Sequence, residues 1–309
     1  MSVEPNVSVV IVTYNGQNVI SKCLNTLLES SNLLSQIIVV DNNSSDNTPN
    51  ILADYGQDIE LISLDENLGF GRANNIGINN ALCHNADFVL LLNQDVFFDS
   101  DNLSKFLKVS TNISNENIGI FSPIHIDNSK EQLDYNFKIF LFKHHPSSLV
   151  DACLLNTVDS QESYPITFSN AAIWLLPKRT IRLVGGFDPL FFHYGEDRNY
   201  VNRVRHQGLS THIVPNTYAI HSRGKNDGAY KKEHLAKFQF LVEASDPNAN
   251  FPLISLLLRI VYRNYITTDG KLKVLSKSLK DAIVSLGKWR RSRKLRQSYF
   301  QKSDYRYLD

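Results

Sequence analysis

The chain contains 309 residues, and 42% of them are hydrophobic, so it can bury a substantial core and does not belong with globally disordered proteins. The formal net charge of +1 hides an asymmetry, because residues 1–250 carry 18 Lys and Arg against 27 Asp and Glu, whereas residues 251–309 carry 14 against 4. No apolar run approaches the roughly 18 to 20 residues that a membrane-spanning helix needs, which predicts a soluble or peripheral protein.

The cysteines Cys23, Cys83 and Cys153 are odd in number and far apart, and no C-x-x-C pair occurs. This pattern favours neither a disulfide framework nor a zinc site, so we expect buried, reduced thiols in a cytoplasmic protein. The start of the chain is polar and acidic and lacks the apolar stretch of a signal peptide.

Strands and helices alternate over the first hundred residues. Short apolar runs that stop at polar residues predict buried strands over 7–12, 37–40, 60–64 and 88–92. Helical spacing of apolar residues predicts helices over 17–30 and 72–83, and a short helix after the polar loop 42–48. This alternation predicts an α/β fold with a doubly wound, mostly parallel sheet, in which residues 1–100 form a nucleotide-binding half.

The second part of the chain has a less regular pattern. We expect a helix over 101–111, then mixed strand and loop signals, a strand over 166–176, helices near 178–185 and 196–207, and a short strand near 211–214. Beyond about residue 230 the pattern becomes helical. The predicted domains are 1–230, with an acceptor half at 101–230, and a basic helical extension at 231–309.

Polar side chains stand where the predicted strands end. The run 88–92 stops at Asn93, and Asp95 follows two residues later. In open α/β sheets ligands bind beyond the carboxyl ends of the strands, and Mg²⁺ or Mn²⁺ takes carboxylate and amide oxygens together with substrate phosphates. Asp41, at the end of 37–40, has the position and chemistry to accept hydrogen bonds from a base or ribose. A plain turn explains either position as well.

The segment 67–75 reads Asn-Leu-Gly-Phe-Gly-Arg-Ala-Asn-Asn. Its glycines permit a close backbone approach, and Arg72 has the charge to pair with a diphosphate, although a helix start explains the same residues. The third glycine of a dinucleotide fingerprint is replaced by Asn74, and the segment follows the third strand rather than the first. A Rossmann dehydrogenase is therefore disfavoured.

Two carboxylates, Glu196 and Asp197, follow a loop rich in glycine and aromatic residues over 185–195. A carboxylate there can be partly desolvated and act as a general base, and helix capping is the alternative explanation. His221 follows an apolar pair and has an imidazole that can complete an oxygen-rich metal shell, although a lone histidine is usually structural.

Together these segments resemble the inverting glycosyltransferases of family 2, in particular the rhamnosyltransferase-like branch. The resemblance is carried, in the family's order, by residues 7–16, 40–46, 67–75, 93–95, 186–188 and 196–197. It implies a fold of the glycosyltransferase A type and transfer of a sugar, with inversion, from a dTDP- or UDP-linked donor such as dTDP-rhamnose to a saccharide or polyprenyl-linked saccharide. Cell-surface polysaccharide synthesis is the implied context.

The resemblance also implies roles for individual residues. Asp197 is the implied base, with Glu196 as a neighbour that orients it or binds the acceptor, and the implied Mg²⁺ or Mn²⁺ ligands are Asp95 and His221. The implied nucleotide-binding residues are Thr13, Tyr14, Asn15, Asp41, Asn67, Gly69, Arg72, Asn75 and Asn93. Two positions depart from the family pattern, since Asn93 and Asn199 stand where acids are common. A nucleotidyltransferase and a non-catalytic glycan-binding or scaffolding relative are the alternatives.

The basic tail admits two interpretations. The run 288–296 is densely basic, and 251–262 is apolar but too short to span a membrane. A packed helix with a solvated basic face is one interpretation, and a peripheral anchor of 251–309 on the anionic inner face of the plasma membrane is the other. We expect no nucleic-acid partner, because the basic stretch is terminal and the remainder is acidic.

Overall fold

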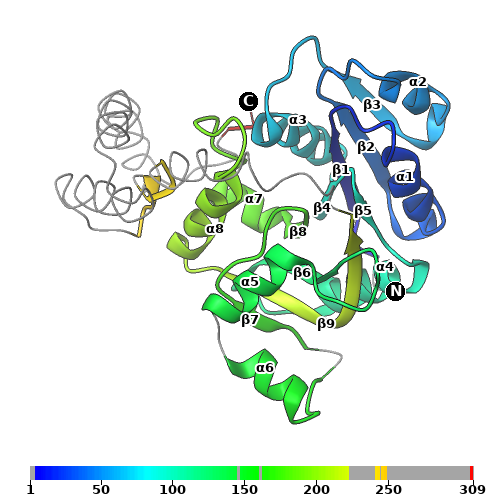
Figure 1. The fold of residues 1–309 in the computed structure, drawn as a ribbon. Coiled ribbons are helices and arrows are strands. Elements are labelled where there is room, and N and C mark those ends of the chain that lie inside the picture. Colours follow the sequence, from blue (N-terminus) through cyan, green and yellow to red (C-terminus); the bar gives the residue numbers. More distant parts are fainter. Residues whose placement is uncertain are drawn as a thin grey trace, which may run out of the picture.

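The computed structural model describes residues 4–144, 147–159, 162–222, 241–243, 245–248 and 307–308. These residues form one mixed sheet of nine strands with helices on both faces (Figure 1). Across the sheet the strands follow the order β3, β2, β1, β4, β8, β6, β9 and β5, and β7 pairs with β9.

The strands share one direction in the first half of the sheet and have mixed directions in the second half. They are β1 Val7–Thr13, β2 Gln36–Asp41, β3 Glu60–Ser63, β4 Phe88–Asn93, β5 Val96–Phe97, β6 Ile118–Ile126, β7 Tyr164–Ile166, β8 Ile173–Pro177 and β9 Ser210–His221. The strands β1 to β4 are parallel, and so are β6 and β9. In contrast, β8 is antiparallel to β4 and β6, and β5 and β7 are antiparallel to β9.

The helices connect these strands. They are α1 Ile20–Leu28, α2 Thr48–Ala53, α3 Phe70–Cys83, α4 Ser100–Asn112, α5 Tyr135–His144, α6 Ser147–Leu154, α7 Lys178–Val184 and α8 Glu196–His206, with short 3-10 turns at Ser31–Leu33 and Gly56–Asp58.

Two apolar layers enclose the sheet, one on each face. Alternate side chains of a strand point to opposite faces, so Val9 and Ile11 of β1 pack with α1, α2 and α4, whereas Val10 and Val12 pack with α3, α7 and α8. Both faces are therefore buried, which is why the central strands read as continuous apolar runs.

The predicted elements of the first hundred residues are present as expected. Each predicted strand and helix of that part has a counterpart whose ends differ by a few residues. The predicted helices over 101–111, 178–185 and 196–207 correspond to α4, α7 and α8. The mixed, mostly parallel sheet confirms the predicted fold class. The domain boundaries at residues 100 and 230 stay predictions.

Three local predictions were incomplete or wrong. The strand expected over 166–176 is found as β8 alone, since the range begins at the last residue of β7 and a turn at Ala171 and Ala172 precedes β8. The region 112–165, where mixed signals were expected, holds β6, α5, α6 and β7. The strand expected over 211–214 extends to His221, because a register shift opposite Pro123 and Ile124 accommodates Asn216, whose φ is +58°.

The prediction that the thiols are buried is confirmed for one of the three cysteines. Cys23 is buried, and burial raises the pKa of its thiol, whereas Cys83 and Cys153 are exposed. Their helices present these two positions to solvent, so burial did not follow from residue type. Within the described residues no helix is long and apolar enough to cross a membrane. The predicted membrane anchor at 251–309 lies outside the described residues, apart from Tyr307 and Leu308.

Candidate active site

Polar residues at the ends of β1, β2 and β4 are brought side by side by the sheet. Thr13 is the register partner of Asp41 on β2, and the preceding Val12 is the partner of Asn93 on β4. The carboxyl ends of parallel strands form the edge where ligands of open α/β sheets bind. The structure therefore gathers three of the predicted nucleotide-binding residues at one edge.

Gln94 lies in the turn that follows β4 and contacts the end of β1. Its Oε1 accepts hydrogen bonds from Thr13 Oγ1 and from the backbone N–H of Tyr14, the latter at 3.0 Å. Tyr14 keeps 46% of its surface exposed, so its ring is accessible at this edge. Sequence reasoning missed Gln94, although its place between Asn93 and Asp95 was a signal that it lies at the site.

The loops after β1 and β2 are tied to each other by short polar contacts. Asn15 Oδ1 accepts from Ser45 N at 2.8 Å, and Asn15 N donates to Ser44 Oγ at 2.9 Å. Asp41 is buried, and its Oδ1 accepts from Ser44 N at 3.2 Å in a turn of its own loop. The turn that was the alternative explanation for Asp41 is thus present, and it fixes the carboxylate at the edge.

The loop before α3 is held to β2 by a pair of asparagines. Asn42 Nδ2 donates to Asn67 Oδ1 at 3.0 Å, and Asn42 Oδ1 accepts from Leu68 N at 2.8 Å. Asn67 Oδ1 also accepts from Gly69 N at 2.9 Å. Asn42 is a second residue that was missed, since an asparagine in a polar loop carries no distinctive signal.

Gly69 brings the loop of residues 185–195 onto the start of α3. Its φ of +81° suits glycine, and a Cβ atom at this position would lie 2.1 Å from the carbonyl oxygen of Phe192. That oxygen accepts a hydrogen bond from Phe70 N at 3.2 Å. Gly69 therefore serves a close approach between two loops, and this approach places the start of α8 next to the start of α3.

Two predicted donor ligands on α3 have different surroundings. Arg72 is exposed in the first turn, and its charge is accessible to a diphosphate. Asn75 is buried, and its amide hydrogen-bonds both N and O of Phe187. Because Phe187 uses both ends of that amide, we propose a structural role for Asn75 in place of the predicted contact with the nucleotide.

The carboxylates at the start of α8 have contrasting environments. Burial, and then the charge of Asp197, raise the pKa of Glu196 to about 8. The Glu196 Oε2 atom is buried without a hydrogen-bond partner among the described residues. Asp197 is half-buried, and its Oδ1 accepts from Arg198 N at 2.6 Å. The guanidinium of Arg198 lies 3.7 Å above the ring of Phe168.

Asp95 and His221 meet because Val96 pairs with His221 at the start of the antiparallel β5–β9 ladder. Their closest atoms, Asp95 Oδ1 and His221 Nε2, are 3.5 Å apart. The His221 side chain is 3% exposed and that of Asp95 is 26% exposed. The pair thus presents one accessible carboxylate backed by a buried imidazole.

Asp95 and His221 are ligand types that suit a divalent cation which also takes phosphate oxygens. His221 Nδ1 and Asn93 Oδ1 are buried without a hydrogen-bond partner in the part of the chain that the structure describes. Within the same residues no three His, Cys, Asp or Glu side chains gather into a metal cage. A cation held by one carboxylate and completed by substrate oxygens, as is usual for Mg²⁺, needs no such cage.

Comparisons with known proteins show which family and which relatives the chain is similar to. Residues 8–144 match the sequence profile of Glycosyl transferase family 2. The dTDP-rhamnosyl transferase RfbF of Shigella flexneri is 27% identical over 219 residues, which are 71% of this chain and 70% of that protein. The O-antigen chain rhamnosyltransferase WbaN of Salmonella anatum is 31% identical over 99 residues, which are 32% of this chain and 30% of that protein.

A solved structure supports the same fold. The mannosyltransferase PcManGT from Pyrobaculum calidifontis, in complex with GDP-Man and Mn²⁺, has a TM-score of 0.54 and 16% identity to this chain, over 96% of this chain and 85% of that one. The sheet of this chain is thus of the glycosyltransferase A type. Residues 8–144 of the chain thus belong to glycosyl transferase family 2.

Proposed function

We propose that this chain transfers rhamnose from dTDP-rhamnose to a saccharide acceptor with inversion at the anomeric carbon. The observation that carries the choice of donor is the 27% identity to a dTDP-rhamnosyl transferase over 71% of this chain. A UDP-linked sugar is the competing donor. The similarity to an O-antigen chain rhamnosyltransferase supports a saccharide or lipid-linked saccharide of the cell surface as the acceptor.

In this proposal the nucleotide binds along the edge formed by β1, β2 and β4. Tyr14 and Asp41 contact the base and ribose, since one offers an accessible ring and the other a fixed carboxylate. Thr13, Asn15, Asn67 and Gly69 shape the surrounding loops. The diphosphate is paired by Arg72, which is exposed at the start of α3.

Asp95, His221 and Asn93 are the residues that hold the cation in this proposal. A bound Mg²⁺ or Mn²⁺ supplies Lewis-acid stabilisation of the negative charge on the leaving diphosphate. His221 is fixed by its burial in β9, and Asn93 brings an oxygen without a charge. Asp95 is therefore the single charged protein ligand.

Asp197 is the proposed base because its neighbour is a poor one at neutral pH. Because burial and the neighbouring charge of Asp197 raise the pKa of Glu196 to about 8, Glu196 keeps its proton at pH 7 and is not available to accept another. Asp197 is also the more exposed of the two. It takes the proton from the acceptor hydroxyl as the oxygen attacks the anomeric carbon, and the bond to the diphosphate breaks.

The test is a donor panel applied to the full chain with Mg²⁺ or Mn²⁺. We expect release of dTDP from dTDP-rhamnose to exceed release of nucleotide from UDP-GlcNAc and GDP-mannose, and to increase when an oligosaccharide acceptor is added. Faster turnover of a UDP-linked sugar would change the donor. No turnover of any donor would favour the non-catalytic alternative.

A further inference from the structure

The first turn of α8, which carries Glu196 and Asp197, is anchored from one side by a buried asparagine. Asn199 lies three residues after Glu196, has no exposed surface, and accepts a hydrogen bond on Oδ1 from Arg203 Nε at 3.0 Å. Its Nδ2 donates to Ser245 Oγ at 2.9 Å. Both ends of the amide are thus used by groups outside the first turn.

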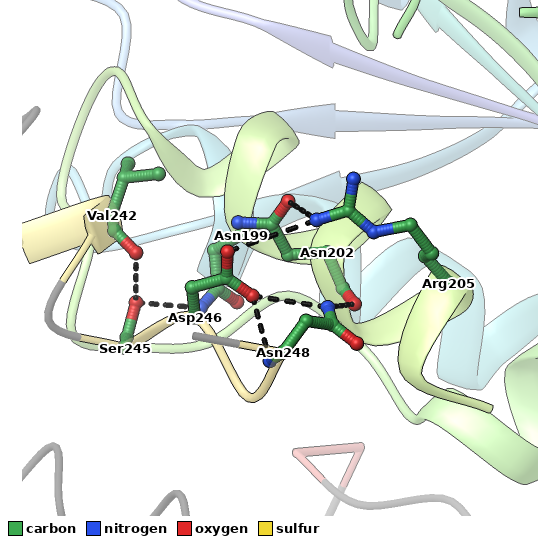
Figure 2. A network of polar contacts seen from close by, with 7 residues as sticks. All are labelled: Asn199, Asn202, Arg205, Val242, Ser245, Asp246 and Asn248. Atoms are coloured by element: carbon green, nitrogen blue, oxygen red, sulfur yellow. Dashed lines mark hydrogen bonds and ion pairs between the residues drawn. The ribbon is translucent and has the colours of Figure 1, made fainter. Parts of the chain in front are cut away.

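Ser245 belongs to a piece of chain that lies against α8, which we call the docked segment (residues 241–243 and 245–248). Figure 2 shows its contacts with the helix. Ser245 Oγ donates to Val242 O at 3.3 Å, and Asn248 Nδ2 donates to Asn202 O at 2.8 Å. Further along the helix, Arg205 Nη2 lies 3.7 Å from Asp246 Oδ2.

The docked segment also touches the residue that precedes the helix. A Cβ atom on Gly195 would lie 3.0 Å from Val242 Cγ2, and Gly195 has a φ of +95°. The backbone oxygen of Gly195 accepts from Asn199 N at 2.9 Å, which closes the first turn of the helix. The segment therefore contacts the turn at its start, through Val242, and at its end, through Ser245.

Arg203 extends this anchoring to the loop that precedes the carboxylates. Its Nη1 donates to Val184 O and its Nη2 to Gly186 O, each at 2.7 Å. The ring of Tyr307, near the end of the chain, lies 5.7 Å from Arg203 Cζ. The loop that begins at Val184 and the ring of Tyr307 are distant in sequence, and both thus contact the buried guanidinium of Arg203.

We propose that Asn199, Arg203 and Ser245 form a positioning network through which the docked segment fixes the orientation of the first turn of α8 and hence of Asp197. The catalytic part of this inference rests on the proposed function. Asn199 then has a positioning role, and its presence where an acid is common does not argue for a non-catalytic relative. An aspartate there would keep the acceptor for Arg203, lose the donor to Ser245 and add a negative charge near Asp197.

Two alanine variants of the docked segment separate positioning from simple stability. Ser245→Ala removes the acceptor of Asn199, whereas Asn248→Ala removes a hydrogen bond from the same segment to the same helix without touching the network. We expect Ser245→Ala to lower the transfer kcat by about tenfold or more, because small displacements of a catalytic group are costly. The donor Kd stays within about twofold, and Asn248→Ala leaves kcat within about twofold.

Hydrogen exchange of the backbone amides of residues 199–201, which donate back into the first turn of α8, gives a readout that needs no reaction. We expect Ser245→Ala to speed exchange there by about tenfold, the scale of one lost hydrogen bond, and Asn248→Ala to leave it unchanged. Equal effects of both variants on exchange, or an unchanged kcat in Ser245→Ala, would overturn the positioning role. If the wild-type chain turns over no donor, the proposed function fails, and the exchange comparison still decides whether the network fixes the turn.

Discussion

Asn75 and Phe187 are joined by two hydrogen bonds, although they are far apart in the chain. Asn75 Oδ1 accepts from Phe187 N at 2.7 Å, and Asn75 Nδ2 donates to Phe187 O at 2.8 Å. The side-chain amide of Asn75 thus satisfies both backbone groups of Phe187, in the loop between α7 and α8, as a neighbouring strand would. This pairing fixes α3, which carries Arg72, relative to the loop that leads to Asp197.

Asn75→Ala should reduce stability rather than nucleotide affinity. The change leaves two buried backbone groups of Phe187 without partners, and each such group costs about 1–3 kcal/mol. Urea denaturation measures the loss, with Asn79→Ala, an exposed position on the same helix, as the control that stays within about 0.5 kcal/mol. If Asn75→Ala is as stable as wild type but binds the donor more weakly, Asn75 contacts the nucleotide after all.

Gly69→Ala and Gly56→Ala form a matched pair that tests the close approach of the two loops. Both glycines have positive φ, but nothing lies within 4 Å of a Cβ atom at Gly56, whereas one at Gly69 would lie 2.1 Å from Phe192 O. We expect Gly56→Ala to cost about 1–2 kcal/mol for its backbone conformation. Gly69→Ala should lower the free energy of unfolding by more than this and also lower the transfer rate, because the loop of residues 185–195 must move. Equal thermal midpoints for the two variants would contradict this.

Glu196→Gln should change the pH dependence of stability. Because the folded pKa is raised to about 8 from an ordinary 4.5, the folded protein keeps a proton that the unfolded chain has released between these values. The contribution of Glu196 to stability is therefore complete at low pH and falls as the pH rises through this window.

The variant lacks this loss, so its free energy of unfolding should gain on that of the wild type between about pH 5 and pH 8. Denaturation curves across that range measure the difference, and Glu29→Gln, at an exposed glutamate, is the control. A difference between Glu196→Gln and wild type that does not vary with pH would mean that Glu196 ionises normally.

Asp95→Ala should weaken nucleotide binding only when a divalent cation is present. Asp95 is the one accessible carboxylate of the Asp95–His221 pair, so its removal deletes the charged ligand. Titration of dTDP with and without Mn²⁺ measures the effect. Asp99→Ala, whose carboxylate pairs with Lys130 at 3.0 Å, is the control. If Mn²⁺ improves dTDP affinity equally in wild type and Asp95→Ala, the cation binds elsewhere.

The parallel half of the fold could be predicted because its signals are local. An apolar run such as Leu90 to Leu92, buried on both faces, ends where the polar residues begin, and glycine marks the turn at Gly69. The antiparallel half could not be predicted as well. Its strands are set by partners distant in sequence, such as β8 between β4 and β6, and β9 continues through Pro215 and Asn216, which read as a turn.

The same distinction applies to the candidate site. Residues at strand ends, such as Asp41 and Asp95, could be named because the edge of a parallel sheet gathers them. The residues that hold the loop after β1 and the helix α8 in place could not. Gln94 and Ser245 act through contacts with residues 80 and 46 positions away, and neither belongs to a pattern that marks such a contact.

The base assignment has a direct test in Asp197→Asn. The change keeps the shape of the side chain and removes its capacity to accept a proton, so we expect the transfer rate from dTDP-rhamnose to fall by at least about two orders of magnitude. The donor Kd should stay within about twofold of wild type, since in this account Asp197 does not contact the nucleotide. Asp101→Asn, the same change in the first turn of α4, is the control for helix-terminal charge.

The most direct measurement is therefore the single-turnover rate of sugar transfer in Asp197→Asn with donor and acceptor saturating. A rate at least about a hundredfold below wild type, with donor binding retained and Asp101→Asn unaffected, is the predicted result. A rate within about threefold of wild type would contradict the account, because the proton of the acceptor hydroxyl would then leave by another route.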